Sequence, residues 1–180
     1  MIRMKKPRSR RKPKFVGFVA ATVDGRISLT KNKLPDWTSE EDWRFFQKSL
    51  VCFDAFVVGR NTYESAAKRL QKRNTYVLSS RPKTILRQEN VTFVNPDRVN
   101  LAQLFRKYKN VAVLGGGAVY RYMAEQKLLD EIYVTFEPLV FGRGKEMFAG
   151  GTKTIKLCLL SIRKLNKKGT LLLHYRIPHK

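Results

Sequence analysis

The segment Val111–Tyr120 constrains the fold of this chain more than any other stretch, because a short apolar run is followed there by three glycines. The apolar residues 111–114 predict a strand that is buried on both faces, which is typical of a parallel sheet. Gly115, Gly116 and Gly117 then lead into a predicted helix that ends near Leu128. Without side chains there, a flat or anionic group could lie against the first amide groups of that helix. A tight turn would need the same glycines, so the segment alone leaves both interpretations open.

Length and charge limit the organisation of the chain and the kind of partner that it can bind. With 180 residues, 43% of them hydrophobic, the sequence predicts one domain with a hydrophobic core. Residues 1–14 carry eight basic residues and no acidic one, so we expect a disordered arm before a domain at 15–180. Removing those eight charges from the formal net charge of +23 still leaves +15. This sign favours anionic partners, namely nucleic acid, a phosphorylated cofactor or a polycarboxylate substrate.

Cysteine and histidine usage argues against a disulfide and against a metal site. Cys52 and Cys158 lie in apolar sequence, so we expect both to be small buried side chains. His174 and His179 are the two histidines and lie near the end of the chain, which does not indicate a metal centre. The sequence has no apolar run of about 18 residues and no secretory leader, so we expect a soluble, cytoplasmic protein.

Strands and helices alternate along the predicted domain. Strands are predicted over 14–22, 54–59, 75–78, 91–94, 111–114 and 131–136, and a terminal hairpin over 154–165 and 170–177. Helices are predicted from a capping box at Thr38 and Glu41 to about Leu50, and over 60–70, 100–108 and 117–128. The fold class is therefore α/β, a doubly wound, mostly parallel sheet with an antiparallel carboxyl-terminal hairpin. The apolar residues of segment 27–37 follow neither the helical nor the strand period, so we expect this segment to be a ligand-covering loop.

Three predicted strands end in residues that are suited to phosphate binding. Segments 59–62, 79–81 and 115–117 each follow a buried strand, and the carboxyl ends of parallel strands line one crevice of an open sheet. Arg60 and Arg81 could clamp a phosphate monoester there, which favours a phosphorylated, adenosine-type cofactor. Taken singly, Thr62 and Ser79 would be explained equally well as caps, and the arginines as surface residues.

Asp42 is the strongest candidate for a proton donor. At helical spacing it shares one face with Phe45 and Phe46, and Trp37 lies in the loop just before the helix. A carboxyl group on an apolar stripe is expected to have a raised pKa and to be able to deliver a proton. A first-turn acid could also serve the helix dipole, although the two glutamates before Asp42 already supply that charge.

In these motifs the sequence resembles dihydrofolate reductase, from about Phe15 to Gly150. The motif L-P-D-W at 34–37 is similar to the family's Leu-Pro-Trp, and Asp42 and Phe46 follow at the family's spacing. The motif G-R-N-T-Y-E-S at 59–65 resembles Gly-Arg-Lys-Thr-Trp/Tyr-Glu-Ser, and 73–82, 114–120 and 132–135 complete the series in order. The resemblance implies a dihydrofolate reductase-like fold and the NADPH-dependent reduction of 7,8-dihydrofolate to tetrahydrofolate.

The resemblance also implies a role for each matching residue at the substrate. Asp42 would hold the amino and ring N–H groups of the pterin and assist protonation of its N5 atom, with Thr135 bridged to it and Trp37 beside it. Arg73 would pair with the α-carboxylate of folate. The other substrate residues that the resemblance implies are Phe18, Ala20, Phe46, Leu70 and Leu114.

The cofactor implied by the resemblance is NADPH. Its adenosine side would be held by Arg60, Thr62, Ser79, Ser80 and Arg81. The Gly115–Gly116 peptide bond would be cis and lie beneath the cofactor, while Ala20, Ile27 and the loop 28–37 would cover the nicotinamide. The remaining cofactor residues that the resemblance implies are Gly59, Asn61, Gly117, Ala118, Val119 and Tyr120.

Departures from the family's pattern keep a second activity open. Asp36 is an additional residue in the loop motif, and Asn61 stands where the family often has a basic side chain. Segments 23–27, 54–59 and 171–177 are more similar to the related reductase domain of riboflavin biosynthesis. That enzyme shares the fold and the cofactor but reduces the ribose of a pyrimidine ribosylamine phosphate. Arg73 and the spacing of residues 37, 42 and 46 favour folate.

A third interpretation is a basic nucleic-acid-binding protein on a reductase-like scaffold. Its sign would be steeply salt-dependent binding to RNA or DNA without NADPH turnover. The arm lacks interleaved aromatic residues, so we favour the reductase and expect at most nonspecific nucleic-acid contact through residues 1–14. We expect a monomer or a homodimer.

Overall fold

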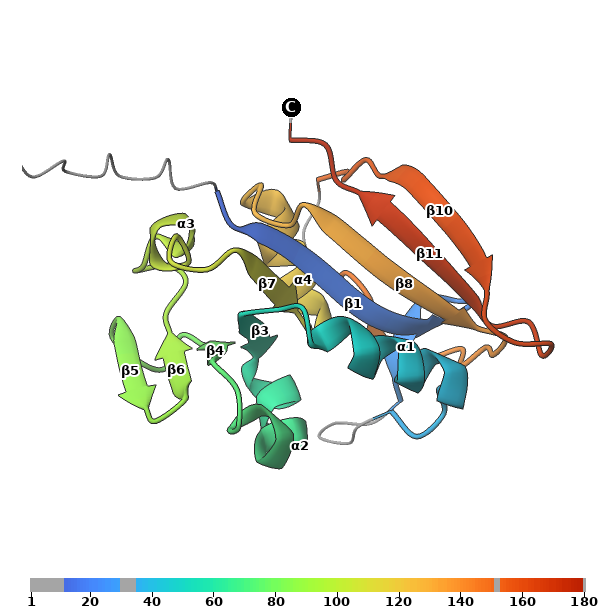
Figure 1. The fold of residues 1–180 in the computed structure, drawn as a ribbon, viewed down its shortest axis with the longest axis horizontal. Helices are drawn as coiled ribbons and strands as arrows, with labels where there is room; N and C mark the ends of the chain where they lie inside the picture. The colour runs from blue at the N-terminus through green and yellow to red at the C-terminus, as the bar shows by residue number, and fades with distance from the viewer. Residues whose placement is uncertain (1–11, 30–34, 151–152, 180) are drawn as a thin grey trace, which may run out of the picture.

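The computed structural model describes residues 12–29, 35–150 and 153–179. Within this part of the chain, a nine-stranded sheet forms the centre of the molecule (Figure 1). Its strands follow one another across the sheet in the order β10 (Cys158–Lys164), β11 (Leu171–Arg176), β8 (Glu131–Glu137), β1 (Lys14–Thr22), β7 (Asn110–Val113), β3 (Ala55–Gly59), β4 (Thr75–Leu78), β6 (Val91–Val94) and β5 (Ile85–Gln88). A separate two-stranded sheet pairs β2 (Arg26–Ser28) with β9 (Lys145–Glu146).

The strands from β8 to β6 run parallel, and both edges of the sheet are antiparallel. Each neighbouring pair from β8 through β1, β7, β3 and β4 to β6 is parallel. The strands β11 and β10 add an antiparallel hairpin beside β8, and β5 lies antiparallel to β6 at the other edge. The predicted α/β class is therefore confirmed, and the structure adds the edge strand β5.

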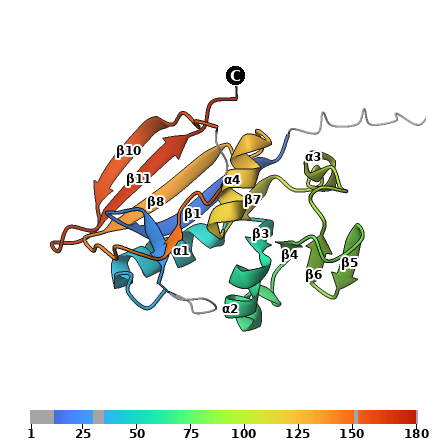
Figure 2. The same cartoon turned by 180° about the vertical axis from the view of Figure 1, so that it is seen from behind.

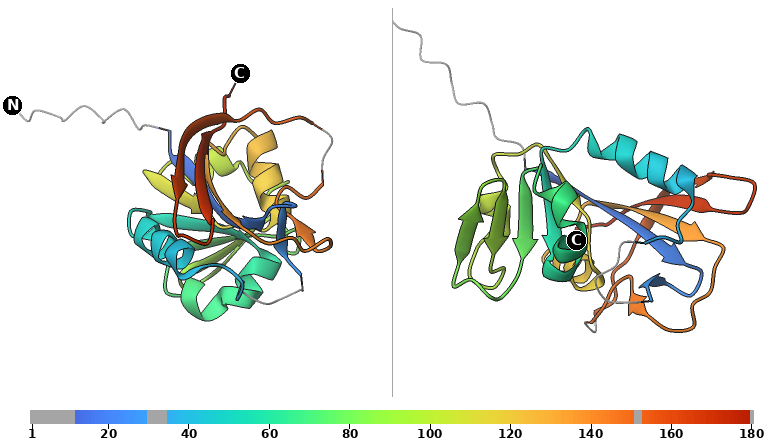
Figure 3. Two further views of the ribbon diagram at one scale, coloured as in Figure 1. Left: turned by 90° about the vertical axis from the view of Figure 1, so that its right-hand side faces the viewer. Right: turned by 90° about the horizontal axis from the view of Figure 1, so that it is seen from below.

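Helices cover the two faces of the sheet. On one face, α1 (Glu40–Leu50) packs its apolar side on Phe18 and Phe56, and α2 (Arg60–Leu70) lies beside it. On the other face, α4 (Gly117–Glu125) packs on Phe15 and Val57, near the short helix α3 (Leu101–Leu104). Figure 2 shows α4 in front of the sheet, and Figure 3 shows the helices on opposite sides of it. This arrangement follows from the period of a strand, in which successive side chains point to opposite faces.

Strand β7 occupies the middle of the sheet, as its sequence predicts. Val111, Ala112 and Val113 are completely buried, and β7 pairs in parallel with β1 on one side and with β3 on the other. A strand with neighbours on both edges and helices on both faces leaves no side for polar residues. The glycines that follow β7 therefore lie at the centre of the edge where the parallel strands end.

Several element boundaries differ from the prediction. Ser39, not Thr38, is the N-cap of α1, because its side-chain oxygen accepts a hydrogen bond from the backbone N–H of Asp42 at 3.3 Å. The predicted helix at 100–108 is regular only over α3, and tighter turns follow it. The carboxyl-terminal hairpin becomes regular at Cys158 rather than at residue 154. Strands β2, β5 and β9 were not predicted, since each is short and none forms a long apolar run.

The expectation that both cysteines are buried is wrong. Cys52 and Cys158 are exposed, and neither forms a disulfide. Cys52 lies in the turn that follows α1, and Cys158 begins the edge strand β10, in which all seven residues are exposed. Apolar neighbours in sequence do not bury a residue when its strand lies at the edge of the sheet and no element covers it.

The predicted basic arm lies largely outside the described residues, which begin at Lys12. Lys14 already belongs to β1 and forms an ion pair with Glu131 at 2.8 Å, so the folded domain includes the last residue assigned to the arm. Part of the loop predicted at 28–37 also lies outside the description, namely residues 30–34. In the part that the structure describes, no helix has the length and apolar character needed to cross a membrane, and no group of three acidic, cysteine or histidine residues could hold a metal ion.

Candidate active site

A cavity of about 1480 Å³ lies between α1, α2 and the carboxyl ends of the parallel strands. Its walls include residues 18–20 of β1, the junction of β3 with α2 at 58–62, the end of β4 at 78–80, and residues 116–120 at the start of α4. The structure thus brings the three predicted strand ends to one edge. Twenty of the predicted site residues line the cavity: Phe18, Ala20, Ile27, Asp42, Phe46, Gly59, Arg60, Asn61, Thr62, Leu70, Arg73, Ser79, Ser80, Leu114, Gly116, Gly117, Ala118, Val119, Tyr120 and Thr135.

Asp42 places a carboxyl group in the wall of this cavity. It lies in the first turn of α1, and its side chain is hydrogen-bonded to the hydroxyl group of Thr135 on β8. Burial raises the pKa of Asp42, the negative charge of the nearby Glu137 raises it further, and the hydrogen bond with Thr135 opposes this increase. The direction agrees with the expectation from its position on an apolar stripe, and it favours a group that carries a proton closer to neutral pH than an exposed aspartate does.

Aromatic rings line the same cavity as Asp42. The ring of Phe18, 6% exposed, stacks on Tyr133 with a centroid separation of 5.3 Å, and it meets the edges of Phe46 and Phe53 at 6.0 Å and 5.4 Å. Phe45 packs on both Phe18 and Tyr133. A carboxyl group at the edge of such an aromatic surface suits a flat ligand that carries hydrogen-bond donors on one edge.

The cavity has a basic end near the carboxyl terminus of α2. The guanidinium of Arg73 lies 4.9 Å from the ring centroid of Phe56, and that of Arg69 lies 4.8 Å from the ring centroid of Trp43. Lys72 lies between them in sequence and also lines the cavity. Among the described residues, none of these three cations forms an ion pair with a carboxylate. An anionic group of a ligand could therefore be bound at this end.

The opposite part of the cavity is built around two helix N-termini. The N-cap residues of α2 and α4 are Gly59 and Gly116, so neither helix has a side chain that caps its first amide groups. The peptide bond between Gly115 and Gly116 is cis, as the resemblance implied. Gly115 has a φ of +88°, and a Cβ at this position would lie 2.8 Å from the ring of Tyr120, so only glycine fits there. Free amide groups at helix N-termini are suited to phosphate groups.

Arg60 points to the kind of ligand that this part of the cavity can hold. Its Nε atom is buried and has no hydrogen-bond partner among the described residues, and its closest carboxylate, Glu64, is 3.7 Å away. Asn61, Thr62 and Ser79 lie around it in the cavity wall. An unsatisfied buried donor next to uncapped helix termini is suited to an anion.

Three residues predicted for the site do not line the cavity. Arg81 is exposed, and its backbone N–H donates a hydrogen bond to the side-chain oxygen of Ser79 at 3.2 Å. The predicted clamp of two arginines is thus reduced to Arg60. Trp37 packs edge-on against Phe141 at 5.2 Å and contributes to loop packing instead of lining the cavity. Gly115 lies just behind the wall, where its carbonyl oxygen accepts a hydrogen bond from the N–H of Gly59.

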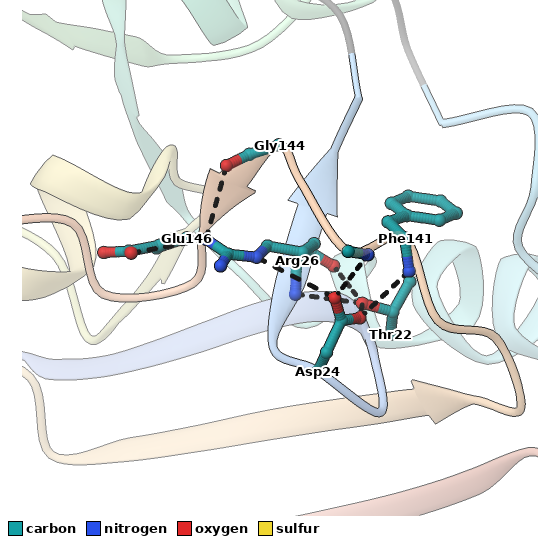
Figure 4. Close-up of polar contacts among 7 residues, drawn as sticks. Thr22, Asp24, Arg26, Phe141, Gly144 and Glu146 are labelled. Carbon is teal, nitrogen blue, oxygen red and sulfur yellow. Dashed lines mark hydrogen bonds and ion pairs between the residues drawn. The ribbon is translucent and has the colours of Figure 1, made fainter.

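The loop after β1 is fastened to the segment that precedes β9 (Figure 4). The carboxylate of Asp24 accepts hydrogen bonds from the backbone N–H groups of Phe141 at 3.2 Å and Gly142 at 2.8 Å, and from the hydroxyl group of Thr22 at 2.5 Å. Arg26 reaches the carboxylate of Glu146 at 3.3 Å. These contacts hold β2 and β9 together at the cavity, where residues 27–28 and 144–146 form part of the wall.

Sequence reasoning missed several residues of the cavity. Tyr133 precedes the predicted Thr135 by two positions and Trp43 follows the predicted Asp42 by one, so a residue-by-residue comparison passed over them. Arg69 and Lys72 were read only as part of the overall charge. Glu137, which lies outside the cavity wall, was not singled out either, although it follows Thr135 by two residues on the same face of β8 and is 4% exposed. A charged residue at the end of a largely apolar strand was the available signal.

These features define a doubly wound α/β domain with a ligand cavity at the carboxyl ends of its parallel strands. The chain belongs to the dihydrofolate reductase family, since the family model for dihydrofolate reductase matches residues 15–138. Among curated proteins it is similar to the uncharacterized protein YwjB of Bacillus subtilis, with 27% identity over 172 residues, which cover 90% of this chain and 97% of that protein.

Solved structures share the fold at low sequence identity. A pyrimidine reductase-like protein from Corynebacterium diphtheriae has a TM-score of 0.72 at 15% identity, and the match covers 97% of this chain and 96% of that chain. Dihydrofolate reductase from Enterococcus faecalis, complexed with NADP(H) and RAB-propyl, has a TM-score of 0.65 at 21% identity, with 93% and 98% coverage. The fold is therefore that of dihydrofolate reductases and of related pyrimidine reductase-like proteins.

Proposed function

We propose that this protein catalyses the NADPH-dependent reduction of 7,8-dihydrofolate to tetrahydrofolate. The observation that carries the proposal is the position of Asp42, bonded to Thr135, at the edge of an aromatic surface inside the cavity. A pterin is a flat ring with an amino group and a ring N–H on one edge. That edge matches the carboxylate of Asp42, while the ring faces would contact Phe18 and Phe46.

The cofactor half of the cavity fits NADPH. The buried Nε atom of Arg60, which has no hydrogen-bond partner among the described residues, and the glycine N-caps of α2 and α4 supply donors for phosphate groups. Arg60, Thr62, Ser79 and Ser80 would hold the adenosine side, and Gly116 and Gly117 would lie against the diphosphate. When bound, NADPH supplies the hydride. The use of this cofactor by a protein of the same fold, the Enterococcus faecalis enzyme complexed with NADP(H), supports the assignment.

The chain's own groups would bind the substrate and move the proton. The carboxyl of Asp42 accepts hydrogen bonds from the amino and ring N–H groups of the pterin, and Thr135 fixes the orientation of that carboxyl. Its raised pKa favours a carboxyl group that can give up a proton during the reaction, and N5 of the pterin would receive that proton. Arg73 receives the α-carboxylate at the basic end. Ile27 and Lys145, on the paired strands β2 and β9, cover the cavity and exclude water.

A second candidate is the reduction of a pyrimidine ribosylamine phosphate. It is supported by the shared fold of the pyrimidine reductase-like protein and by the position of Trp37 outside the cavity. Arg69, Lys72 and Arg73 could receive a phosphate group as well as a carboxylate. Asp42 favours the pterin, because a pterin is reduced in the ring system that carries the planar N–H donors, whereas the pyrimidine substrate is reduced in its ribose.

The two candidates are separated by measuring NADPH oxidation with each substrate. We expect turnover with 7,8-dihydrofolate and none with 5-amino-6-ribosylaminouracil phosphate, and product analysis should identify tetrahydrofolate. Turnover with the ribosylamine phosphate alone would overturn the proposal in favour of the second candidate. Arg73→Gln should raise the KM for dihydrofolate at least about tenfold, in line with a lost charged hydrogen bond, while Arg106→Gln, on the far side of the sheet, serves as the matched control.

A further inference from the structure

Glu137 is a buried carboxylate, and the reaction proposed above assigns no role to it. It is the last residue of β8, lies two residues beyond Thr135 and is 4% exposed. Residues two apart on a strand share a face, so the side chain of Glu137 lies on the same side of the sheet as Thr135, below the start of α1. Among the described residues, no arginine, lysine or histidine forms an ion pair with it. A buried charge without a cation requires an explanation from its other contacts.

Both carboxylate oxygens of Glu137 accept hydrogen bonds, as in an ionised carboxylate. Oε1 accepts from the backbone N–H of Ser39 at 2.6 Å, and Oε2 accepts from the hydroxyl group of Thr170 at 2.6 Å. Ser39 is the N-cap of α1, and its own side-chain oxygen accepts from the backbone N–H of Asp42. Glu137 therefore holds the residue that in turn holds the backbone of the proton donor.

The carboxyl-terminal hairpin completes this connection. The side-chain amide of Asn166 donates hydrogen bonds to the hydroxyl oxygen of Thr170 at 2.9 Å and to the carboxylate of Glu41 at 3.2 Å. Glu41 precedes Asp42 on α1, so the hairpin turn reaches the helix at a second point. The beginning of α1 is thereby fastened to β8 and to the turn between β10 and β11, which is far from it in sequence.

Charged groups approach Asp42 from several elements. Glu137 faces it from β8 and raises its pKa, while Glu41, on its own helix, is engaged with Asn166 and lies near Arg44 and Lys168. The charged side chains elsewhere in the cavity wall are Arg60, Arg69, Lys72, Arg73, Lys145 and Glu146. Of all these groups, Glu137 is the acidic group that combines burial, the absence of a paired cation among described residues, and an electrostatic effect on Asp42.

We propose that Glu137 is a positioning residue that fixes the start of α1 through Ser39 and places a second, buried carboxylate near Asp42. This inference rests on the function proposed above, because it takes Asp42 to be the proton donor. A like charge close to a carboxyl group disfavours loss of its proton. A carboxylate at position 137 thus acts in two ways, by its hydrogen bond with Ser39 and by its charge near Asp42. A neutral acceptor there would keep only the hydrogen bond.

The matched variants are Glu137→Gln and Thr170→Val. E137Q retains an oxygen that accepts from Ser39 but removes the charge, whereas T170V removes one hydrogen bond to Glu137 and leaves its charge in place. In the full-length protein, the pH dependence of turnover is measured together with the titration of the Asp42 carboxyl carbon by NMR, with Asp42→Asn to assign the signal. Thermal unfolding of both variants gives the structural contribution separately.

For E137Q we expect the titration midpoint of Asp42, and the limb of the pH profile that reports its protonated form, to move to lower pH by on the order of half to one pH unit. T170V should lower the melting temperature and leave both midpoints in place. If both variants lower the melting temperature and neither moves the midpoints, Glu137 is structural only and the proposal is overturned. If E137Q does not fold, Glu137→Asp replaces it, since withdrawing the charge should move the midpoint the same way by less; an unmoved midpoint again overturns the proposal.

The NMR titration needs no substrate, so it separates this inference from the proposed function. A shifted midpoint in a protein that reduces neither candidate substrate would contradict the proposed function while leaving the charge effect of Glu137 on Asp42 established. Turnover of dihydrofolate with an unshifted midpoint would support the proposed function and reject the role of Glu137.

Discussion

The backbone N–H of Gly59 donates a hydrogen bond to the carbonyl oxygen of Gly115 over 2.6 Å. This contact joins the carboxyl ends of β3 and β7 behind the cavity, one residue before α2 begins and two residues before α4 begins. The uncapped N-termini of the two helices consequently open into one space. A single ligand with two phosphate-bearing parts could therefore meet both helices, which is why the cofactor half of the site depends on glycines more than on any one charged side chain.

Arg60 should determine the preference for NADPH over NADH. Its buried Nε atom has no hydrogen-bond partner among the described residues and is 3.7 Å from the carboxylate of Glu64, so a 2′-phosphate would provide the missing acceptor. Arg60→Gln is expected to weaken NADPH binding by about 1.5–3 kcal/mol, roughly 10- to 150-fold, with little change for NADH. Arg81→Gln is the matched control, since Arg81 is exposed and lies outside the cavity wall, and should leave the preference within about twofold. Titration of cofactor binding by fluorescence measures both variants. Equal affinity of the unmodified protein for NADH and NADPH would contradict the assignment.

Asp42→Asn should lower turnover with dihydrofolate at neutral pH by about two orders of magnitude or more, within the range of a lost general acid. Asparagine keeps the shape of the side chain but presents an N–H group where the pterin edge needs an acceptor. Lower pH should partly restore turnover, because substrate protonated in solution no longer depends on the missing carboxyl. The measurement is the pH profile of turnover, with NADPH affinity as the control that stays unchanged. Near-full activity of this variant, together with loss of activity in Asp36→Asn, would assign the acid to the additional residue of the loop.

Gly117→Ala should destabilise the fold more than Gly17→Ala. A Cβ at position 117 would lie 2.2 Å from the backbone carbonyl oxygen of Glu146, so α4 and the strand β9 would have to separate. At position 17 the added methyl group would lie 2.9 Å from the side chain of Ile132, which can rotate. We expect a loss of at least about 2 kcal/mol for G117A and about 1 kcal/mol for G17A, measured by denaturant unfolding. A larger loss of unfolding free energy for G17A would contradict this prediction, because it would show that α4 and β9 can separate at little cost.

Asp24 should make the stability of the protein depend on acid pH. The hydrogen bond from Thr22 and those from the backbone N–H groups of Phe141 and Gly142 hold the pKa of Asp24 below its usual value of 3.8. A carboxyl whose folded pKa is lowered contributes stability above its unfolded pKa, and this contribution is lost as the pH falls through the folded pKa. Melting temperature should therefore fall less steeply below pH 3.8 for Asp24→Asn than for the unmodified protein. Parallel curves for the two proteins would contradict the prediction.

The sequence predicts the parallel part of the fold well, because its signals are local. The continuous apolar runs at β1, β3, β4 and β7 identify buried strands without knowledge of their neighbours, and the glycines after β7 mark the edge of the sheet where the cavity lies. The strands β2 and β9 cannot be predicted in this way. They have three and two residues, and these residues are extended because the two strands pair with each other. The same reasoning fails for Cys158, whose exposure depends on its strand lying at the edge of the sheet.

At the site, candidate residues identified from helical spacing line the cavity, whereas some candidates from loops do not. Asp42 lies in the cavity wall, in the first turn of α1. Arg81 lies outside the wall, with its backbone N–H bonded to the side chain of Ser79, and no pattern in the sequence reveals that conformation. The role that we propose for Glu137 depends on its hydrogen bonds with Ser39 and Thr170, both of which are distant from it in sequence.

The strand order also determines when this chain can fold during synthesis. Strand β1 is the first strand of the described residues, and its partners there are β7 and β8, so that Lys14 lies opposite Asn110 and Val16 opposite Glu131. About one hundred further residues must therefore leave the ribosome before β1 can enter the sheet, which takes roughly 5 to 20 seconds at ordinary elongation rates. Throughout that interval the apolar side chains of β1, such as Phe15 and Phe18, have no native partner strand. Synthesis of the second half of the chain thus limits assembly of the first, and a nascent chain that stalls before residue 110 exposes an unpaired hydrophobic strand to chaperones.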